Sequence, residues 1–480
     1  MPAVAPFVFE PFELDPTRRR LTSSGEPVAV SARHLDVLLL LVVRAGQIVS
    51  KDDLLQAGWK DVAVGDNSLE QAIGSLRRLL GTHPSGAAYI ETVPRRGYRF
   101  GVPVARRASR ESDADLDALL APHRAFLEGR AMLESLERDR IARARHVFED
   151  ALRTAAEHAS AHVGLANACI MQFETTRADP RPDTGALAVA ARHAREACRL
   201  DPQFGEAWAT LGFVLDRTGD RVDALAAAKR AVTLEPDNWR HHFRLAYVSW
   251  GEARLRAAHR TLALLPGFPL AHWLAATVHV ARQAFDEAER ELAAAVASES
   301  DRASGEWRFS SVALHWLRGL LHLARGREPR AIEEFELELS REHAGHLYAR
   351  ECCANTWYAL GALRLRQGRG DEAIAAFAHA LERVPMHAMA RVGLAAAGSR
   401  DAMAGPSGAG PLSIEAAVVR AAQLTIAGAH DDAGCAVDEA LAGTAPGNAG
   451  WLVPIEPLLH VDAHPDSWAR PLARLRNRAA

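Results

Sequence analysis

The sequence has little cysteine and almost no net charge. Its five cysteines, Cys169, Cys198, Cys352, Cys353 and Cys435, form no CxxC and no other paired spacing. We therefore predict neither a disulfide framework nor a zinc site, and the pattern favours a reducing compartment. The adjacent Cys352–Cys353 leaves two interpretations open, a redox switch or two small apolar residues of a helix, and the second is favoured.

Long hydrophobic runs are also missing. The longest, 35–43, contains Asp36 and is far too short to cross a bilayer. The first fifteen residues are acidic and lack the basic start of a signal peptide. We expect a cytoplasmic protein that makes no membrane contact.

Catalytic motifs are lacking as well. The chain contains no GxSxG, HExxH or P-loop. His241–His242 and the pair His343 and His346 come closest to metal-ligand spacing, but no third ligand is evident, and solvated helix faces are the favoured interpretation. We expect no enzyme, no cofactor and no metal.

The chain is long, with 480 residues, and its apolar content of 48% and charged content of 24% are those of a folded protein. Two or three domains are expected at this length. Residues 1–107 carry a net charge of +3, whereas the whole chain carries −3. Nearly all of the positive charge is arginine, which suits bidentate contacts to phosphate and guanine, although a GC-rich genome would produce the same bias.

The first hundred residues alternate strand and helix signals. Residues 7–14 and 28–30 read as short antiparallel strands. Ser31 can cap a helix that ends at Gly46, and Ser50 can cap a second helix over 51–59.

A third helix follows, capped by Asp66 or Asn67. Its apolar residues fall on one face at helical spacing: Leu69, Ala72, Ile73, Leu76, Leu79 and Leu80. The outward-facing residues are then Asn67, Gln71, Gly74, Ser75 and Arg78.

A hairpin over 89–100 closes this region. Pro94 to Gly97 forms a turn that contains Arg95 and Arg96, and Tyr98 and Phe100 share one face of the second strand while Arg99 takes the other. A helix fits the major groove of DNA, and an arginine-tipped hairpin reaches phosphates or the minor groove. An amphipathic helix with a hairpin also occurs in many other folds, but the combination favours a winged helix-turn-helix.

The chain here resembles the OmpR/PhoB-type winged-helix DNA-binding domain over about residues 7–104. The resemblance rests on the early strands, on LLQAGW, on DNSLEQAIGSLRRLLG and on YIETVPRRGYRF. It implies double-stranded DNA as partner, with the helix in the major groove and the hairpin as wing. The family's DNA-contacting positions then fall on Trp59, Asn67, Gln71, Ser75, Arg77, Thr92 and Tyr98.

Two departures from the family stand out. Gly74–Ser75 replaces the arginines common in the middle of the helix, and Arg95 and Arg96 replace small residues of the wing. We infer fewer guanine contacts from the helix and more backbone or minor-groove contacts from the wing. Gln71 could read adenine or simply face solvent.

The basic residues at the end of the same helix point to the DNA backbone. Arg77 and Arg78 are the favoured phosphate contacts of this segment, each worth about one unit of salt slope.

Beyond a polar linker at 108–120, the chain shows helical periodicity with a repeat of about 34 residues, the period of tetratricopeptide (TPR) repeats. One unit runs from Gly205 to Asn238, and a second begins at Ala354. Their signature residues are Trp208, Leu211, Gly212, Gly219, Ala224, Ala228, Ala231 and Pro236, and Trp357, Leu360, Gly361, Gly368, Ala373, Phe377, Ala380 and Pro385. Small residues let paired helices approach, and the proline ends the second helix.

The sequence therefore predicts an α+β winged helix-turn-helix domain over 1–107 and, after the linker, an all-α TPR solenoid over 121–400. A flexible break over 401–412 and a degenerate final repeat with a cap over 413–480 follow. The tryptophans Trp208, Trp239, Trp250, Trp273, Trp307, Trp316 and Trp357 mostly take repeat-core positions; an aromatic ligand groove is the alternative.

We expect a one-component or partner-controlled transcriptional regulator that receives its signal, a protein partner or a peptide in the TPR groove. Because the module starts at residue 7, we expect no receiver domain before it. Because one module buries little surface, homodimers or tandem binding are expected. The alternative is a TPR interaction scaffold whose winged helix docks protein rather than DNA.

Overall fold

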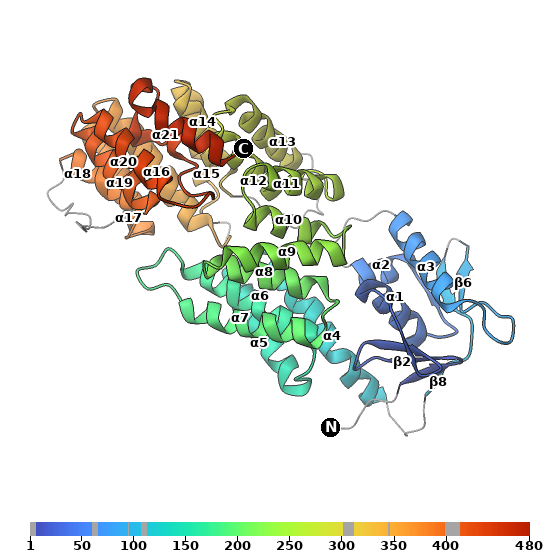
Figure 1. Cartoon of the computed structure of the whole chain (residues 1–480). Coiled ribbons are helices and arrows are strands. Elements are labelled where there is room, and N and C mark those ends of the chain that lie inside the picture. Colours follow the sequence, from blue (N-terminus) through green and yellow to red (C-terminus); the bar gives the residue numbers. More distant parts are fainter. Residues whose placement is uncertain are drawn as a thin grey trace. The chain divides into compact units, whose positions relative to one another are not determined.

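The computed structural model describes residues 6–59, 66–94, 96–106, 113–300, 312–343, 346–398 and 413–480. A small α+β domain is followed by a long series of helices (Figure 1). By their Cα positions the residues fall into two compact units. The first takes 1–129, 146–164 and 196–204, and the second takes 130–145, 165–195 and 205–480.

Two small antiparallel sheets build the α+β domain. The first has the order β4-β3-β2-β1-β8 and the second has the order β5-β7-β6. Their strands are β1 (Phe7–Phe9), β2 (Phe12–Asp15), β3 (Arg20–Ser23), β4 (Glu26–Val28), β5 (Ile48–Val49), β6 (Ile90–Val93), β7 (Gly97–Phe100) and β8 (Ala105–Arg106). The strand predicted at 28–30 lies two residues earlier, because pairing with β3 sets Val28 opposite Leu21.

Three helices complete the domain: α1 (Ala32–Val43), α2 (Lys51–Trp59) and α3 (Asp66–Leu80). The caps predicted for α1 and α2 are confirmed, and the cap predicted for α3 at Asp66 or Asn67 depends on side chains outside the described residues. The Ser31 hydroxyl accepts a hydrogen bond from the His34 amide at 3.3 Å, and the Ser50 hydroxyl accepts one from the Asp53 amide at 3.1 Å. Each cap satisfies an amide that the helix itself leaves unpaired.

The apolar face predicted for α3 is buried in the domain core. Leu69, Ala72, Ile73 and Leu76 are at most 1% exposed. They belong to one cluster with the buried side of α1 and with Phe100 of β7. Burial of this apolar face fixes which side of α3 faces outward.

The remaining helices follow one another along the chain. They are α4 (Asp113–Glu134), α5 (Arg138–Thr154), α6 (Ala159–Thr176), α7 (Thr184–Leu200), α8 (Gly205–Arg217), α9 (Arg221–Leu234), α10 (Trp239–Val248), α11 (Glu252–Leu264), α12 (Pro269–Ala281), α13 (Phe285–Ser300), α14 (Leu314–Ala324), α15 (Glu328–Leu339), α16 (Ala349–Arg366), α17 (Gly370–Arg383), α18 (Ala388–Ala396), α19 (Ile414–Ile426), α20 (His430–Ala442) and α21 (Pro465–Arg478), with the short 3₁₀ turns η1 (Val453–Ile455) and η2 (Pro457–Leu459) before α21. Neighbours pack in pairs, such as α8 with α9 and α16 with α17.

The repeat logic read from the sequence is confirmed in these pairs. A Cβ at Gly212 would lie 2.8 Å from the Ala224 carbonyl oxygen, and one at Gly361 would lie 2.6 Å from the Phe377 ring. Only glycine permits such close helix packing. Pro236 follows the end of α9 by two residues, as the repeat pattern predicts.

Two segments far apart in the sequence meet within the second unit. The Leu347 amide donates to the Leu136 carbonyl oxygen at 2.7 Å. Arg177, just after α6, pairs with Glu351 of α16 at 2.6 Å, and Arg350 pairs with Asp179 at 2.6 Å. These contacts join the early repeats to the repeat that begins with α16.

Two expectations need correction. Helix α4 begins at Asp113, inside the predicted linker 108–120, and the leucines at 116, 119 and 120 give that stretch helical spacing. His241 and His242 are 1% and 8% exposed rather than solvated. The turn before α10 buries them, since His242 Nε2 lies 2.8 Å from the Pro236 carbonyl oxygen.

Buried histidines also occur elsewhere in the chain. His346 is 4% exposed, whereas its companion His343 is exposed as expected. Among the described residues, no three His, Cys, Asp or Glu side chains gather where they could hold a metal ion.

The predicted break at 401–412 and Trp307 lie outside the described residues.

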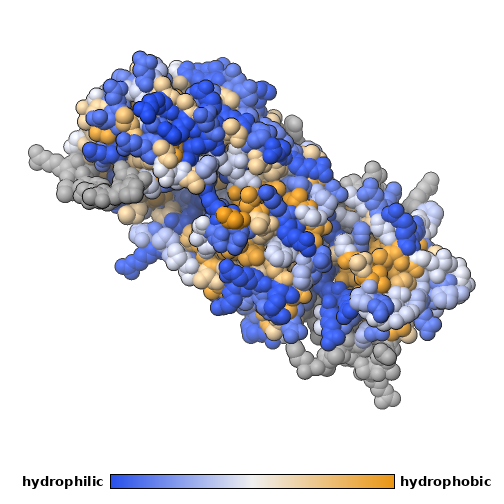
Figure 2. Space-filling model, viewed as in Figure 1, coloured by the Kyte–Doolittle hydropathy of each residue, from blue (hydrophilic) through white to orange (hydrophobic). Residues whose placement is uncertain are grey.

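Most of the face shown in Figure 2 is hydrophilic, with smaller hydrophobic areas over the α+β domain and over the early repeats. The exposed large hydrophobic side chains of the described residues are Val222 on α9, Leu337 on α15, Met386 in the turn before α18 and Ile426 on α19. Isolated side chains of this kind are ordinary. Within the described part of the chain, no helix has the length and apolar character that a bilayer span requires.

Candidate nucleic-acid interface

The outward face of α3 carries a stripe of polar residues. Gln71 and Arg78 are exposed and Ser75 is half-buried. These positions are separated by three or four residues, so their side chains lie on one side of the helix. The Arg78 Nη2 donates to the Ser75 hydroxyl at 3.3 Å, which leaves most of the guanidinium exposed. Three of the predicted contact residues therefore share one accessible surface.

Arg77 connects this helix to the hairpin. Its Nε donates to the Ile90 carbonyl oxygen at 3.0 Å, and its Nη2 donates to the Thr92 hydroxyl at 2.8 Å. The guanidinium carbon also lies 5.9 Å from the centre of the Tyr98 ring. The structure thus brings together Arg77, Thr92 and Tyr98, and Arg77 positions the hairpin while its charge stays at the surface.

The turn of the hairpin presents Arg96 to solvent. Its backbone amide donates to the Val93 carbonyl oxygen at 3.0 Å and closes the turn. The next residue, Gly97, has φ +130°, and a Cβ there would lie 2.0 Å from the Val49 carbonyl oxygen. Glycine is required because β5 approaches the hairpin so closely. Arg95 lies outside the described residues.

Two of the predicted contact residues lie mainly in the core. Trp59 is 8% exposed and Tyr98 is 5% exposed, and both belong to the domain's hydrophobic cluster. Only their edges are accessible, so a DNA contact from either residue would involve a small part of the side chain. Asn67 belongs to α3, but its side chain lies outside the described residues.

The sequence reasoning missed an ion pair on this surface. Glu70 is exposed on α3, and its carboxylate lies 3.4 Å from Lys51 Nζ at the start of α2. A carboxylate repels phosphate, and the lysine offsets that repulsion. The spacing of Glu70 to Gly74 would have placed it beside the outward residues, but the partner on α2 has no sequence signal.

A second exposed ion pair lies on the hairpin. Arg99 of β7 pairs with Glu91 of β6 at 2.6 Å. As the alternation predicted, Arg99 points away from buried Tyr98 and Phe100. Its charge is thus largely compensated, whereas no ion pair among the described residues involves Arg77, Arg78 or Arg96.

Comparison with known proteins agrees with this geometry. Residues 25–100 match the family described as "Transcriptional regulatory protein, C terminal", and residues 133–203 and 358–399 match the tetratricopeptide repeat family. The transcriptional regulator HilA of Salmonella typhimurium is 40% identical over 98 residues, which cover 20% of this chain and 17% of HilA. The transcriptional activator CadC of Escherichia coli is 31% identical over 90 residues, which cover 18% of each chain.

Among solved structures, the DNA-binding domain of CadC from E. coli is 27% identical, with a TM-score of 0.20, and covers 21% of this chain and 96% of that domain. The chain spans less than a fifth of the length of the curated relatives HilA and CadC. The likeness is therefore one of the N-terminal domain. The chain combines an OmpR/PhoB-type winged helix-turn-helix domain with TPR repeats.

Proposed function

We propose that this chain, with its OmpR/PhoB-type domain and TPR repeats, is a cytoplasmic, non-enzymatic transcriptional regulator that binds double-stranded DNA. The observation that carries the proposal is the family match of residues 25–100 together with the exposed stripe of α3. In this arrangement α3 enters the major groove and the β6–β7 hairpin acts as wing. Phosphate contacts fix the register, and base contacts supply the sequence preference.

We assign individual roles to the predicted contact residues. Gln71 and Ser75 face the bases, because they lie in the middle of the stripe with short or uncharged side chains. Arg78, Arg95 and Arg96 contact phosphates, Asn67 does so at the start of α3, and Arg77 holds the wing against the helix. Thr92 contributes from its exposed position on β6, whereas Trp59 and Tyr98 contribute only through their accessible edges.

The repeats supply the second half of the proposal. We assign to residues 121–400 the binding of a protein partner, a peptide or another signal, with residues 1–107 holding DNA and 413–480 closing the array. Homodimers or tandem binding on repeated half-sites would raise the specificity of a single module.

A gel-shift assay with genomic DNA fragments at several salt concentrations tests the DNA-binding proposal. Arg95→Ala/Arg96→Ala is expected to weaken binding and to lower the salt slope by about two units, one per lost phosphate contact. Arg256→Ala is the matched control, because this arginine is 70% exposed on α11 within the repeats. Equal and weak binding by wild type and both variants would favour the protein-docking scaffold instead.

A further inference from the structure

The second helices of successive helix pairs change the sign of their charge partway along the chain. α7, α9 and α11 each have three basic residues against one acidic residue. α13 and α15 each have five acidic residues against one arginine, and α17 has three acidic residues against one arginine. A polyanion is therefore attracted to the first three of these helices and repelled by the next three.

Four cations on α7 and α9 carry a charge that no ion pair offsets. All four side chains are exposed. Within the described part of the chain, none of them takes part in an ion pair or donates a side-chain hydrogen bond. We call these four residues the cation patch: Arg192, Arg195, Lys229 and Arg230.

The two halves of the cation patch lie at equivalent positions of neighbouring repeats. Three buried alanines of α7 recur 34 residues later on α9, in the pairs Ala190 and Ala224, Ala194 and Ala228, and Ala197 and Ala231. Arg195 and Lys229 are separated by the same 34 residues, so both point away from the buried side of their helix. Arg192 precedes Arg195 by about one turn and shares its side of α7. Because neighbouring repeats stack, the four cations form one surface.

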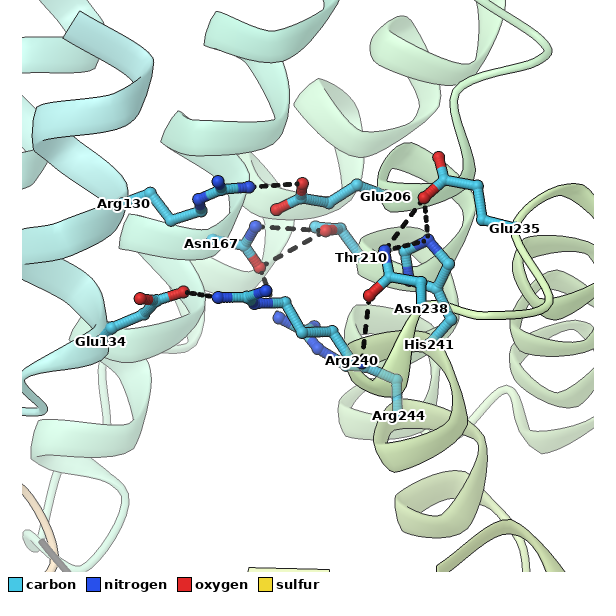
Figure 3. A network of polar contacts seen from close by, with 10 residues as sticks. All are labelled: Arg130, Glu134, Asn167, Glu206, Thr210, Glu235, Asn238, Arg240, His241 and Arg244. Carbon is cyan, nitrogen blue, oxygen red and sulfur yellow. Dashed lines mark hydrogen bonds and ion pairs between the residues drawn. The ribbon is translucent and has the colours of Figure 1, made fainter. Parts of the chain in front are cut away.

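Other cations of the neighbouring helices differ because they have carboxylate partners. Figure 3 shows this for Arg240 of α10 and Glu134 of α4, which lie 2.6 Å apart. On α11 the exposed arginines also lie beside carboxylates, in the pairs Arg256–Glu252 at 3.8 Å and Arg260–Asp237 at 3.1 Å. The uncompensated charge is therefore concentrated on α7 and α9.

We infer that the cation patch binds the phosphate backbone of duplex DNA beside the site that the winged helix recognises. Duplex DNA presents one negative charge per about 1.7 Å of its axis, and guanidinium groups match the geometry of phosphate. Because phosphate contacts do not depend on base identity, the patch adds affinity without changing the sequence preference. The inference rests on the proposed function, since the winged helix brings the DNA to the same chain and raises its effective concentration at the repeats.

The acidic helices of a second copy of the chain are the competing partner, and the composition of the surface disfavours them. The exposed residues one turn before Arg192 and Lys229 are the small Ala188 and Ala226. No large apolar side chain therefore separates the cations, whereas the centre of a protein interface is usually apolar. The long cationic side chains extend past these alanines toward solvent, where a phosphate backbone is accessible to them.

Fluorescence anisotropy of the full chain on two duplexes tests the inference. The short duplex is the smallest one that still binds the chain sequence-specifically, and the long duplex carries the same site with two further helical turns on each side. Wild type should bind the long duplex at least tenfold more tightly. Its salt slope on the long duplex should be larger by about three to four units, about one for each phosphate contact of the patch.

Arg192→Gln/Arg195→Gln/Lys229→Gln/Arg230→Gln removes the charge of the patch. This variant should bind the long duplex at least tenfold more weakly than wild type and lose about three to four units of salt slope. Its binding to the short duplex and its Tm should stay as in wild type, because all four side chains are exposed. The half variant Lys229→Gln/Arg230→Gln should lose about half of that slope.

A control variant removes the same amount of charge from four exposed arginines that already lie 3.1–3.8 Å from a carboxylate. It is Arg256→Gln/Arg260→Gln/Arg290→Gln/Arg470→Gln, and it should bind both duplexes as wild type does. An equal loss of binding in the control and in the patch variant would show a general effect of net charge and would overturn the inference.

The two duplexes separate failure of the inference from failure of the proposed function. If wild type binds both duplexes with equal affinity and equal salt slope, the patch makes no DNA contact and the function of the winged helix stands. If wild type binds neither duplex, the proposed function fails and the inference fails with it.

Sedimentation of wild type and patch variant examines the second copy as partner. A salt-sensitive dimer that is lost in the patch variant, with unchanged binding to the long duplex, would make this surface an interface between copies and would overturn the inference. The inference expects the same oligomeric state in both proteins.

Discussion

Individual buried groups set how the stability of this protein depends on pH. Glu456, at the start of η2, accepts a hydrogen bond from the Tyr358 hydroxyl and another from the Leu458 amide at 3.4 Å. Burial raises the pKa of Glu456 to about 7, and these hydrogen bonds only partly counteract it. The folded chain therefore holds this proton more tightly than the unfolded chain does.

Stability should fall as the pH rises between about 4.5 and 7, because the raised folded pKa makes ionisation of Glu456 costly in the folded state. Glu456→Gln removes that ionisation, and we expect it to stabilise the protein by about 1–2 kcal/mol at pH 8 and by little at pH 4.5. Urea unfolding of wild type and variant across this range measures the difference. An equal effect of the substitution at both pH values would contradict the assignment.

Arg77 and Arg78 are neighbours in sequence but differ in role. Arg77 donates hydrogen bonds to Ile90 and Thr92, whereas the hydrogen bond of Arg78 within the described part of the chain goes to Ser75 of its own helix. Arg77→Ala should lower domain stability by about 1 kcal/mol and also weaken DNA binding. Arg78→Ala should weaken DNA binding alone. Thermal unfolding together with the gel shift separates the two, and equal stability losses would refute the distinction.

The sequence could not reveal that Arg77 and Arg78 differ in role, because the hydrogen-bond acceptors of Arg77 lie on a strand that only the fold brings near. The same holds for Trp59, whose burial follows from packing against other elements of the domain. The outward positions of Gln71, Ser75 and Arg78 could be predicted, since helical periodicity alone decides which side of α3 is apolar.

At the level of elements, the close approach of β5 to the wing depends on one glycine. Gly97→Ala should destabilise the domain by about 2 kcal/mol or more, because the positive φ and the Val49 carbonyl oxygen both exclude a Cβ. Gly74→Ala is the contrasting variant in the middle of α3, where a Cβ would meet nothing within 4 Å. It should stabilise the helix by about 0.5–1 kcal/mol. Chemical denaturation of both variants provides the comparison.

Helix existence was more predictable than strand limits. Ser31 and Ser50 indicate where α1 and α2 start, because each caps its helix through an amide only three residues further along the chain. The short strand β8 depends on pairing of Ala105 with Val8, nearly a hundred residues earlier. Such register is set by distant partners, so the sequence pattern alone does not specify it.

At the scale of the whole second unit, the pair Arg177–Glu351 joins segments 174 residues apart in sequence. Arg177 also lies 3.1 Å from Glu174, and the burial of the Glu174 side chain favours a strong ion pair. No periodic pattern announces such a contact, because each repeat signature describes only neighbours.

Glu351→Gln should loosen this junction. We expect faster amide hydrogen exchange at the end of α6 and at the start of α16, and unchanged exchange in α19 and α20, which lie outside the contact. Mass spectrometry of the exchanging chain measures this. Asp431→Asn, at the start of α20, is the matched control and should leave the α6 and α16 amides as in wild type. Uniform exchange across all four helices in Glu351→Gln would argue for global destabilisation instead.

The bond between the Leu347 amide and the Leu136 carbonyl, with the ion pairs beside it, has a kinetic consequence. An array in which each repeat contacts only its neighbours can extend along its axis. In this chain, contacts also join the early repeats to the repeat that begins with α16. A ligand that needs more space than this joined form provides could enter only after these contacts break. Its rate of entry would then be set by the rate at which the contacts break and would stop rising with ligand concentration.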